Sequence, residues 1–112
     1  MNRTTLPAWE RKRNNETREV EKLLSEEGGF QKVDAYRYNV ASIRVRVIDP
    51  RFEGKSVDQR DRMVDKYLRK LPESTQRDIM NLLTFTPDEI ADEETGQFRA
   101  FSLNQEFEHP TS

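Results

Sequence analysis

Cysteine is absent from this 112-residue chain, and histidine occurs once, as His109. Without cysteine the chain forms no disulfide bond, offers no thiolate to a metal and performs no thiol catalysis. No apolar run approaches the roughly 20 residues that a membrane-spanning helix needs, and the first residues lack the apolar core of a signal peptide. We therefore expect a cytoplasmic protein that does not bind a membrane.

Apolar residues are also scarce, at 33% of the chain against 36% charged residues. The charges are unevenly distributed. Residues 1–14 carry four basic residues and one acidic residue, whereas residues 87–112 carry seven acidic residues and one basic residue. Because charged blocks of this kind are usually solvated and mobile, we expect a flexible basic arm over 1–14, one domain over 15–90 and an acidic tail over 91–112.

Two features of these ends are open to interpretation. Trp9 in the arm either packs on the domain or anchors a partner, as exposed tryptophans often do. The tail contains GQFRAFSL, which has the composition of one extra strand. The residues on either side of it have the composition of disordered segments.

Within the domain the sequence predicts a helix, two strands, two helices and a third strand, over about 16–27, 30–40, 42–48, 56–72, 73–81 and 82–86. The helices have apolar residues at helical spacing and capping signals, such as the S-x-x-Q box of Ser56 and Gln59. The strands alternate apolar and polar side chains, and the short link between the first two predicts an antiparallel hairpin. The whole predicts an α+β fold in which a three-stranded mixed sheet carries helices on one face.

Four short motifs, in their order and spacing, resemble the BolA family: YRYNV (36–40), RVRVIDPRFEGK (44–55), RDRMV (60–64) and LLTFT (82–86). The resemblance covers about residues 16–90 and implies an αββααβ fold similar to the class II KH domain. It implies that Phe52 and Gly54 form the turn into the long helix, where glycine permits a sharp reversal of the chain. It also implies that Arg60 and Arg62 lie on the exposed face of that helix.

The resemblance also implies partners and a cofactor. BolA proteins are partners of monothiol glutaredoxins, with which they share a bridging [2Fe-2S] cluster in iron–sulfur trafficking or iron sensing, and some are described as DNA-binding regulators. The family's usual cluster ligand is a histidine just before the last strand, and the matching residue here is Asp78. The loop that carries a second ligand in some members has Val40, Ala41 and Ser42 instead. Since thiolates and sometimes imidazoles hold such clusters, we expect no cofactor and no metal site in this chain.

The sequence supports an enzyme least of all. It contains no phosphate-binding glycine motif and no histidine in the body of the domain. Asp58, Asp61 and Asp65 lie on one helical face with basic residues between them, which predicts a salt-bridged solvent surface. We therefore expect no catalytic residues.

Three interpretations of the function remain open. The first is an adaptor or regulator that docks onto a protein, with a monothiol glutaredoxin as the candidate partner, in iron–sulfur or stress physiology. The second is a nucleic-acid-binding regulator, because residues 44–70 hold nine basic and five acidic residues, although a GxxG loop is missing and the net charge is −2. The third is a domain that has lost its ancestral ligand. The candidate surface for a protein or a nucleic acid comprises Arg44, Arg46, Arg51, Lys55, Arg60 and Arg62.

Overall fold

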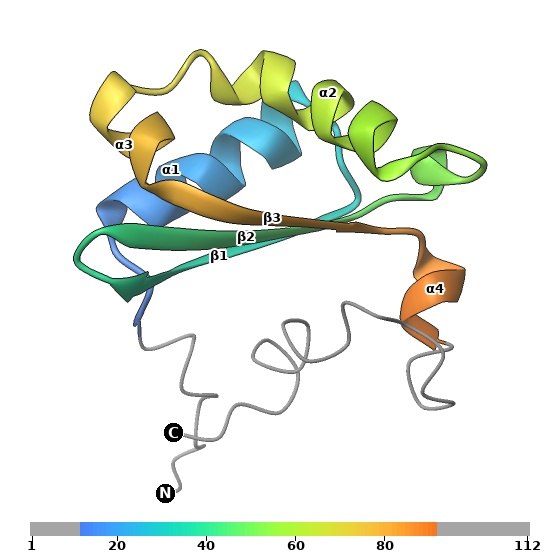
Figure 1. Ribbon diagram of the computed structural model, residues 1–112, viewed down its shortest axis with the longest axis horizontal. Helices are drawn as coiled ribbons and strands as arrows, with labels where there is room; N and C mark the ends of the chain where they lie inside the picture. The colour runs from blue at the N-terminus through green and yellow to red at the C-terminus, as the bar shows by residue number, and fades with distance from the viewer. Residues whose placement is uncertain (1–11, 92–112) are drawn as a thin grey trace, which may run out of the picture.

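The computed structural model describes residues 12–91, which form a layer of helices on a three-stranded sheet (Figure 1). In chain order the elements are α1 (Asn15–Lys22), β1 (Lys32–Asn39), β2 (Ser42–Ile48), α2 (Val57–Leu68), α3 (Glu73–Asp78), β3 (Ile79–Phe85) and α4 (Pro87–Ala91). A π-helical turn over Leu23–Glu27 continues α1, and a 3₁₀ turn over Pro50–Phe52 follows β2. Figure 1 shows α1, α2 and α3 on the same face of the sheet, with α4 beyond the end of β3.

Some predictions concern residues outside the described range. The basic arm with Trp9, and the acidic tail with GQFRAFSL and His109, fall on residues 1–11 and 92–112, which lie outside the described residues. The division of the chain at 15 and 90 therefore stays a prediction. None of the helices within residues 12–91 has the length and apolar character needed to cross a membrane.

The sheet is mixed and has the order β1-β2-β3. β1 and β2 are antiparallel, with Ala35 opposite Val45, and β2 and β3 are parallel, with Val45 opposite Leu82. The predicted α+β fold, with its αββααβ order and its β-hairpin, is confirmed. The helix α4 adds one further turn after the last strand.

Apolar side chains of both layers meet in one core, whose buried members are Val20, Leu24, Phe30, Val33, Ala35, Ile43, Val45, Val47, Phe52, Val64, Leu68 and Leu71. Phe52 has no exposed surface, and its ring lies 5.8 Å from that of Phe30. Two residues later Gly54 has a φ of +75°, in the left-handed region where a side chain is disfavoured. Phe52 thus anchors, and Gly54 reverses, the segment that leads from β2 into α2.

Local capping signals fix where the helices begin. The Ser56 Oγ accepts a hydrogen bond from the Gln59 N–H at 3.2 Å, while the Gln59 Oε1 accepts one from the Ser56 N–H at 2.8 Å. Thr86 and Glu89 form the same reciprocal pair before α4, at 3.1 and 2.9 Å. Each pair satisfies backbone donors that the first helical turn leaves without a partner.

The structure differs from the prediction at the start of β3. The predicted helix extends to residue 81, but α3 ends at Asp78 and β3 begins at Ile79. Ile79 pairs with Ile43 of the central strand, so pairing with β2 overrides the local helical preference of this segment. Asp78 consequently lies at the junction between a helix and a strand.

Candidate functional site

Asp78 is held by an arginine from the hairpin. The Arg37 Nη2 donates hydrogen bonds to Asp78 Oδ2 at 2.8 Å and to Glu16 Oε1 at 2.6 Å, and the Arg37 Nε donates to the same Glu16 oxygen at 3.2 Å. These hydrogen bonds, those to Glu16 first and that to Asp78 second, raise the pKa of Arg37. One guanidinium therefore joins α1, β1 and the end of α3.

Arg37 also contacts the turn of the hairpin. Its Nη1 donates to the backbone oxygen of Val40 at 3.0 Å. Within that turn the Asn39 side chain accepts a hydrogen bond from the Ala41 N–H at 2.8 Å. Arg37 thus bridges the two places where the BolA resemblance puts cluster ligands, namely Asp78 and the loop at Val40.

These residues do not fit an iron–sulfur cluster. The carboxylate of Asp78 is already an acceptor for Arg37, and the loop offers backbone groups and small side chains rather than a thiolate or an imidazole. Within residues 12–91 no group of three or more histidine, cysteine, aspartate or glutamate side chains is arranged to hold a metal ion. An arginine bridge occupies the position at which the resemblance implies a cluster.

Exposed apolar side chains occur at the end of the sheet that contains this bridge. Within the described residues the large apolar side chains that are exposed are Tyr38 (46%), Val40 (92%), Val57 (64%) and Met80 (64%). The end of β1, the hairpin turn and the start of β3 lie at one end of the sheet, because β1 is antiparallel and β3 parallel to β2. We call Tyr38, Val40, Asp78 and Met80 the hairpin end.

Arg44 belongs to this same region. Its Cζ lies 3.7 Å from the centre of the Tyr38 ring, a cation–π contact. Its Nη1 also lies 3.5 Å from the Tyr36 hydroxyl, which is at the limit of a hydrogen bond. Arg44 therefore packs against the ring of Tyr38 in the hairpin end.

Two of the six basic residues proposed for a binding surface are buried, which corrects the expectation for them. Arg60 was expected on the exposed face of α2 but is 8% exposed. It lies four residues before Val64 on the core stripe of the helix, and its guanidinium donates to Thr84 O at 3.1 Å and to both Glu89 oxygens at 2.8 and 2.9 Å. The helical periodicity that buries Val64 therefore also buries Arg60.

Arg46 is the other buried cation, at 1% exposure. It lies on the central strand opposite Asp34 of β1, and its Nη2 donates to Asp34 Oδ2 at 2.7 Å. The expectation that Arg46 faces solvent is wrong because the register places a carboxylate beside it.

The remaining basic residues are not brought together. Arg51 donates to Asp49 Oδ1 at 3.0 Å and to Gly28 O at 3.0 Å. Burial opposes ionisation of Asp49, but hydrogen bonds from the Arg51 side chain and from the backbone outweigh it and lower the Asp49 pKa. Of the six candidate residues, Lys55 and Arg62 are exposed and form no internal ion pair within residues 12–91. Their arrangement gives nucleic-acid binding no support, and that alternative stays a prediction.

Comparison with known proteins relates the chain to one fold. No protein-family model matches the chain, and no curated protein matches it in sequence. Among solved structures, BolA1 from Arabidopsis thaliana is 20% identical with a TM-score of 0.52, over 69% of this chain and 98% of that one. The BolA domain of SufE1 from Arabidopsis thaliana is 16% identical with a TM-score of 0.54, over the same shares. The solution structure of BolA1 from Mus musculus is 19% identical with a TM-score of 0.55, over 88% of this chain and 84% of that one. The chain thus has the BolA fold, as the motifs predicted.

Proposed function

We propose that this BolA-fold chain is a non-enzymatic adaptor or regulator that docks onto a protein partner through its hairpin end. The observation that supports this most is the position of the exposed apolar side chains. Three of the four in the described part of the chain, Tyr38, Val40 and Met80, lie at the sheet end that contains Asp78. Clustered apolar side chains at the surface are typical of interaction sites.

The arginine bridge supports a rigid docking site. Arg37 joins the backbone of the turn at Val40 to the carboxylate of Asp78, so charge-assisted hydrogen bonds hold the two segments together without a bound cluster. A preformed surface loses less conformational entropy on binding than a mobile one. Docking at this end therefore requires no metal ligand from this chain.

A monothiol glutaredoxin is the first candidate partner, because the motifs resemble those of BolA proteins. With that partner the chain would act in iron–sulfur or stress physiology, with any cluster ligated by other molecules. The similar structure from SufE1 is a BolA domain of another protein, which supports a role for this fold as an interaction module. The sequence has no cysteine, and its one histidine lies outside residues 12–91, which supports a non-enzymatic role.

The test is calorimetric titration of the full chain with a monothiol glutaredoxin from the same organism, with two matched variants. Met80 and Val57 are equally exposed, at 64%, but only Met80 belongs to the hairpin end. We expect Met80→Glu to weaken binding by about tenfold or more, roughly 1.4 kcal/mol, and Val57→Glu to leave it unchanged. Circular dichroism checks that both variants remain folded.

The negative outcomes are distinct. Absence of binding by the unmodified chain would reject the glutaredoxin as partner. Equal losses in Met80→Glu and Val57→Glu would reject the hairpin end as the docking surface. A charge reversal at Arg60 is unsuitable for this test because Arg60 is buried and its loss would disturb the fold.

A further inference from the structure

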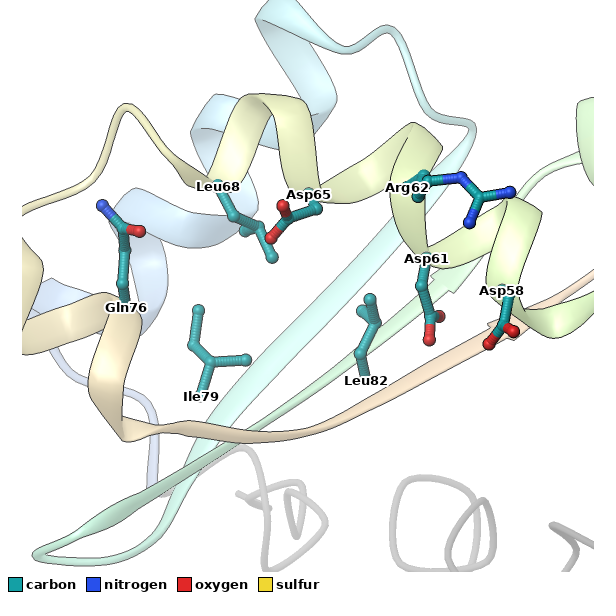
Figure 2. Close-up of a pocket in the computed structure, with 8 residues that line it drawn as sticks. All are labelled: Asp58, Asp61, Arg62, Asp65, Leu68, Gln76, Ile79 and Leu82. Carbon is teal, nitrogen blue, oxygen red and sulfur yellow. The ribbon is translucent and has the colours of Figure 1, made fainter.

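A groove lies between α2 and the segment in which α3 leads into β3 (Figure 2). Its volume is about 450 Å³, and its lining residues are Asp58, Asp61, Arg62, Asp65, Leu68, Gln76, Ile79 and Leu82. This volume exceeds by far that of a single water molecule. We call it the α2–β3 groove.

The two sides of the groove differ in chemistry. α2 contributes three carboxylates and one guanidinium, whereas β3 contributes the half-buried side chains of Ile79 and Leu82. Figure 2 shows the carboxylate of Asp61 directed from α2 toward Leu82. The groove therefore combines an apolar floor with a net negative wall, which suits a side chain that has an apolar stem and a cationic end.

Asp61 is the residue whose bonding is incomplete. Its Oδ1 is buried and has no hydrogen-bond partner within the described part of the chain. Burial first, and then the charges of Asp58 and Asp65, raise the pKa of Asp61. Buried polar atoms are nearly always hydrogen-bonded, so this oxygen is an acceptor to which no protein group of residues 12–91 donates.

The neighbouring charges do not satisfy Asp61. Asp65 pairs with Arg69 at 2.9 Å on the solvent side, which is the salt-bridged surface that the sequence predicts. Arg62 forms no ion pair with these carboxylates within residues 12–91. The predicted pattern thus holds for Asp65 but not for Asp61, whose Oδ1 receives no hydrogen bond from a protein group of residues 12–91.

From these observations we propose that the α2–β3 groove binds a lysine or arginine side chain, flanked by an apolar residue, on an extended segment of a partner protein. The cationic head donates to Asp61, and the apolar neighbour covers Ile79 and Leu82. A metal ion is the poorer occupant, because the carboxylates are not grouped as a metal site within the described residues.

The position of the groove agrees with such a segment. β3 is an edge strand of the sheet that residues 12–91 form, and edge strands are common sites for pairing with extended peptides. Ile79 lines the groove and directly precedes Met80 of the hairpin end. The inference rests on the proposed docking function and assigns the chemistry of the partner next to the hairpin end.

The test uses two synthetic peptides and the ¹⁵N-labelled full chain in NMR titrations. One peptide is an acetylated and amidated pentamer of alternating leucine and lysine, and the other has glutamate in place of lysine. We expect the lysine peptide to shift the amide signals of Ile79 and Leu82, and the glutamate peptide to leave them unchanged. We also expect Asp61→Asn to lower the affinity for the lysine peptide at least fivefold. Asp88→Asn, which removes an exposed carboxylate on α4, should leave that affinity unchanged.

Either of two results would overturn the inference: equal responses to both peptides, or equal affinities of Asp61→Asn and the unmodified chain for the lysine peptide. The peptide titration does not involve a glutaredoxin, so the two proposals fail separately. If glutaredoxin binding depends on Met80 but not on Asp61, the proposed docking function stands and the proposed binding of a cation in the α2–β3 groove is rejected. Selective binding of the lysine peptide without glutaredoxin binding would support the groove and reject that partner.

Discussion

Arg37 and Asp78 are 41 residues apart in the sequence, yet the Arg37 Nη2 donates a hydrogen bond to Asp78 Oδ2 at 2.8 Å. The bond connects β1 with the junction of α3 and β3. The side chain of Arg37 is 17% exposed and that of Asp78 is 29% exposed, so the pair is only partly screened by solvent. The hairpin end is therefore held by an ion pair at the place where the BolA resemblance implies a metal ligand.

Arg37→Lys should destabilise the domain by about 1–2 kcal/mol. An ammonium has no planar fork with which to reach Glu16, Asp78 and the Val40 oxygen together. Urea denaturation measures the loss, and Arg18→Lys is the matched control. Because Arg18 is exposed on α1, its substitution should change the free energy of unfolding by less than about 0.5 kcal/mol. Equal effects of both substitutions would contradict the bridging role of Arg37.

Arg60→Met should destabilise the domain by about 2–3 kcal/mol, because it removes the guanidinium that donates to the Thr84 oxygen and pairs with the charge of Glu89. Arg62 lies two residues along the same helix, on its exposed side. Arg62→Met should change the free energy of unfolding by less than about 0.5 kcal/mol. Thermal unfolding of both variants measures the difference. A neutral Arg60→Met would show that the buried cation contributes little to the fold.

Glu89 should make the stability pH-dependent. The hydrogen bond from Arg60, followed by that from the Thr86 N–H, lowers the pKa of Glu89 below its ordinary value of 4.5 against the effect of burial. A carboxyl group whose pKa is lower in the folded state stabilises the fold above its unfolded pKa, and this contribution is lost as the pH falls through the folded pKa. The stability difference between the unmodified chain and Glu89→Gln should therefore shrink between pH 6 and pH 3. A difference that is constant over this range would contradict the pairing.

Asp61→Asn should stabilise the domain at pH 7. The folded-state pKa of Asp61 is raised, so its charged form opposes folding at neutral pH, and this penalty disappears as the pH falls below the ordinary value of 3.8. The charged groups that line the groove beside it are Asp58, Arg62 and Asp65 of α2, while α3 and β3 contribute uncharged side chains.

Because Asp61 is partly solvated, we expect a gain of less than about 1 kcal/mol at pH 7. The gain should vanish near pH 3, and urea denaturation at both pH values measures it. A loss of stability at pH 7 would mean that Asp61 is satisfied within the isolated chain.

Gly54→Ala should destabilise the domain by about 1 kcal/mol or slightly more, since its φ is +75° and a Cβ is disfavoured there. A Cβ at this position would meet no atom within 4 Å, so the substitution tests backbone strain alone. Gly54→Asn should be milder, because asparagine tolerates the left-handed region better. Equal thermal shifts for alanine and asparagine would show that the strain is not the cause.

The elements of the fold could be predicted from the sequence because their signals are local. The reciprocal cap of Ser56 and Gln59 needs only residues three apart. Alternation in β2 likewise identifies Val45 as a core residue without knowledge of its neighbours.

The candidate site was predictable only in part. The motif spacing identified Asp78 as the position to inspect, but its partner Arg37 comes from a strand 41 residues earlier. The alternating pattern of Tyr36, Arg37 and Tyr38 placed Arg37 in a strand and carried no signal for that contact. Met80 was also missed, since the segment was expected to be helical until pairing of Ile79 with Ile43 made it a strand.

The sequence by itself determined the order of helices and strands, the capping residues and the α+β class, because each depends on short-range periodicity and local hydrogen bonds. The order and spacing of four short motifs carried the resemblance to the BolA family. The tertiary structure determined which partners the charged side chains have. The helical periodicity of α2 turns Arg60 toward the core, but its ion-pair partner Glu89 comes from α4. The register of the sheet supplies Asp34 to Arg46, and neither α3 nor β3 supplies a donor to Asp61 Oδ1. Whether a charge lies in solvent, in an ion pair or in a groove depends on residues that are distant in the sequence, and only the folded chain brings them together.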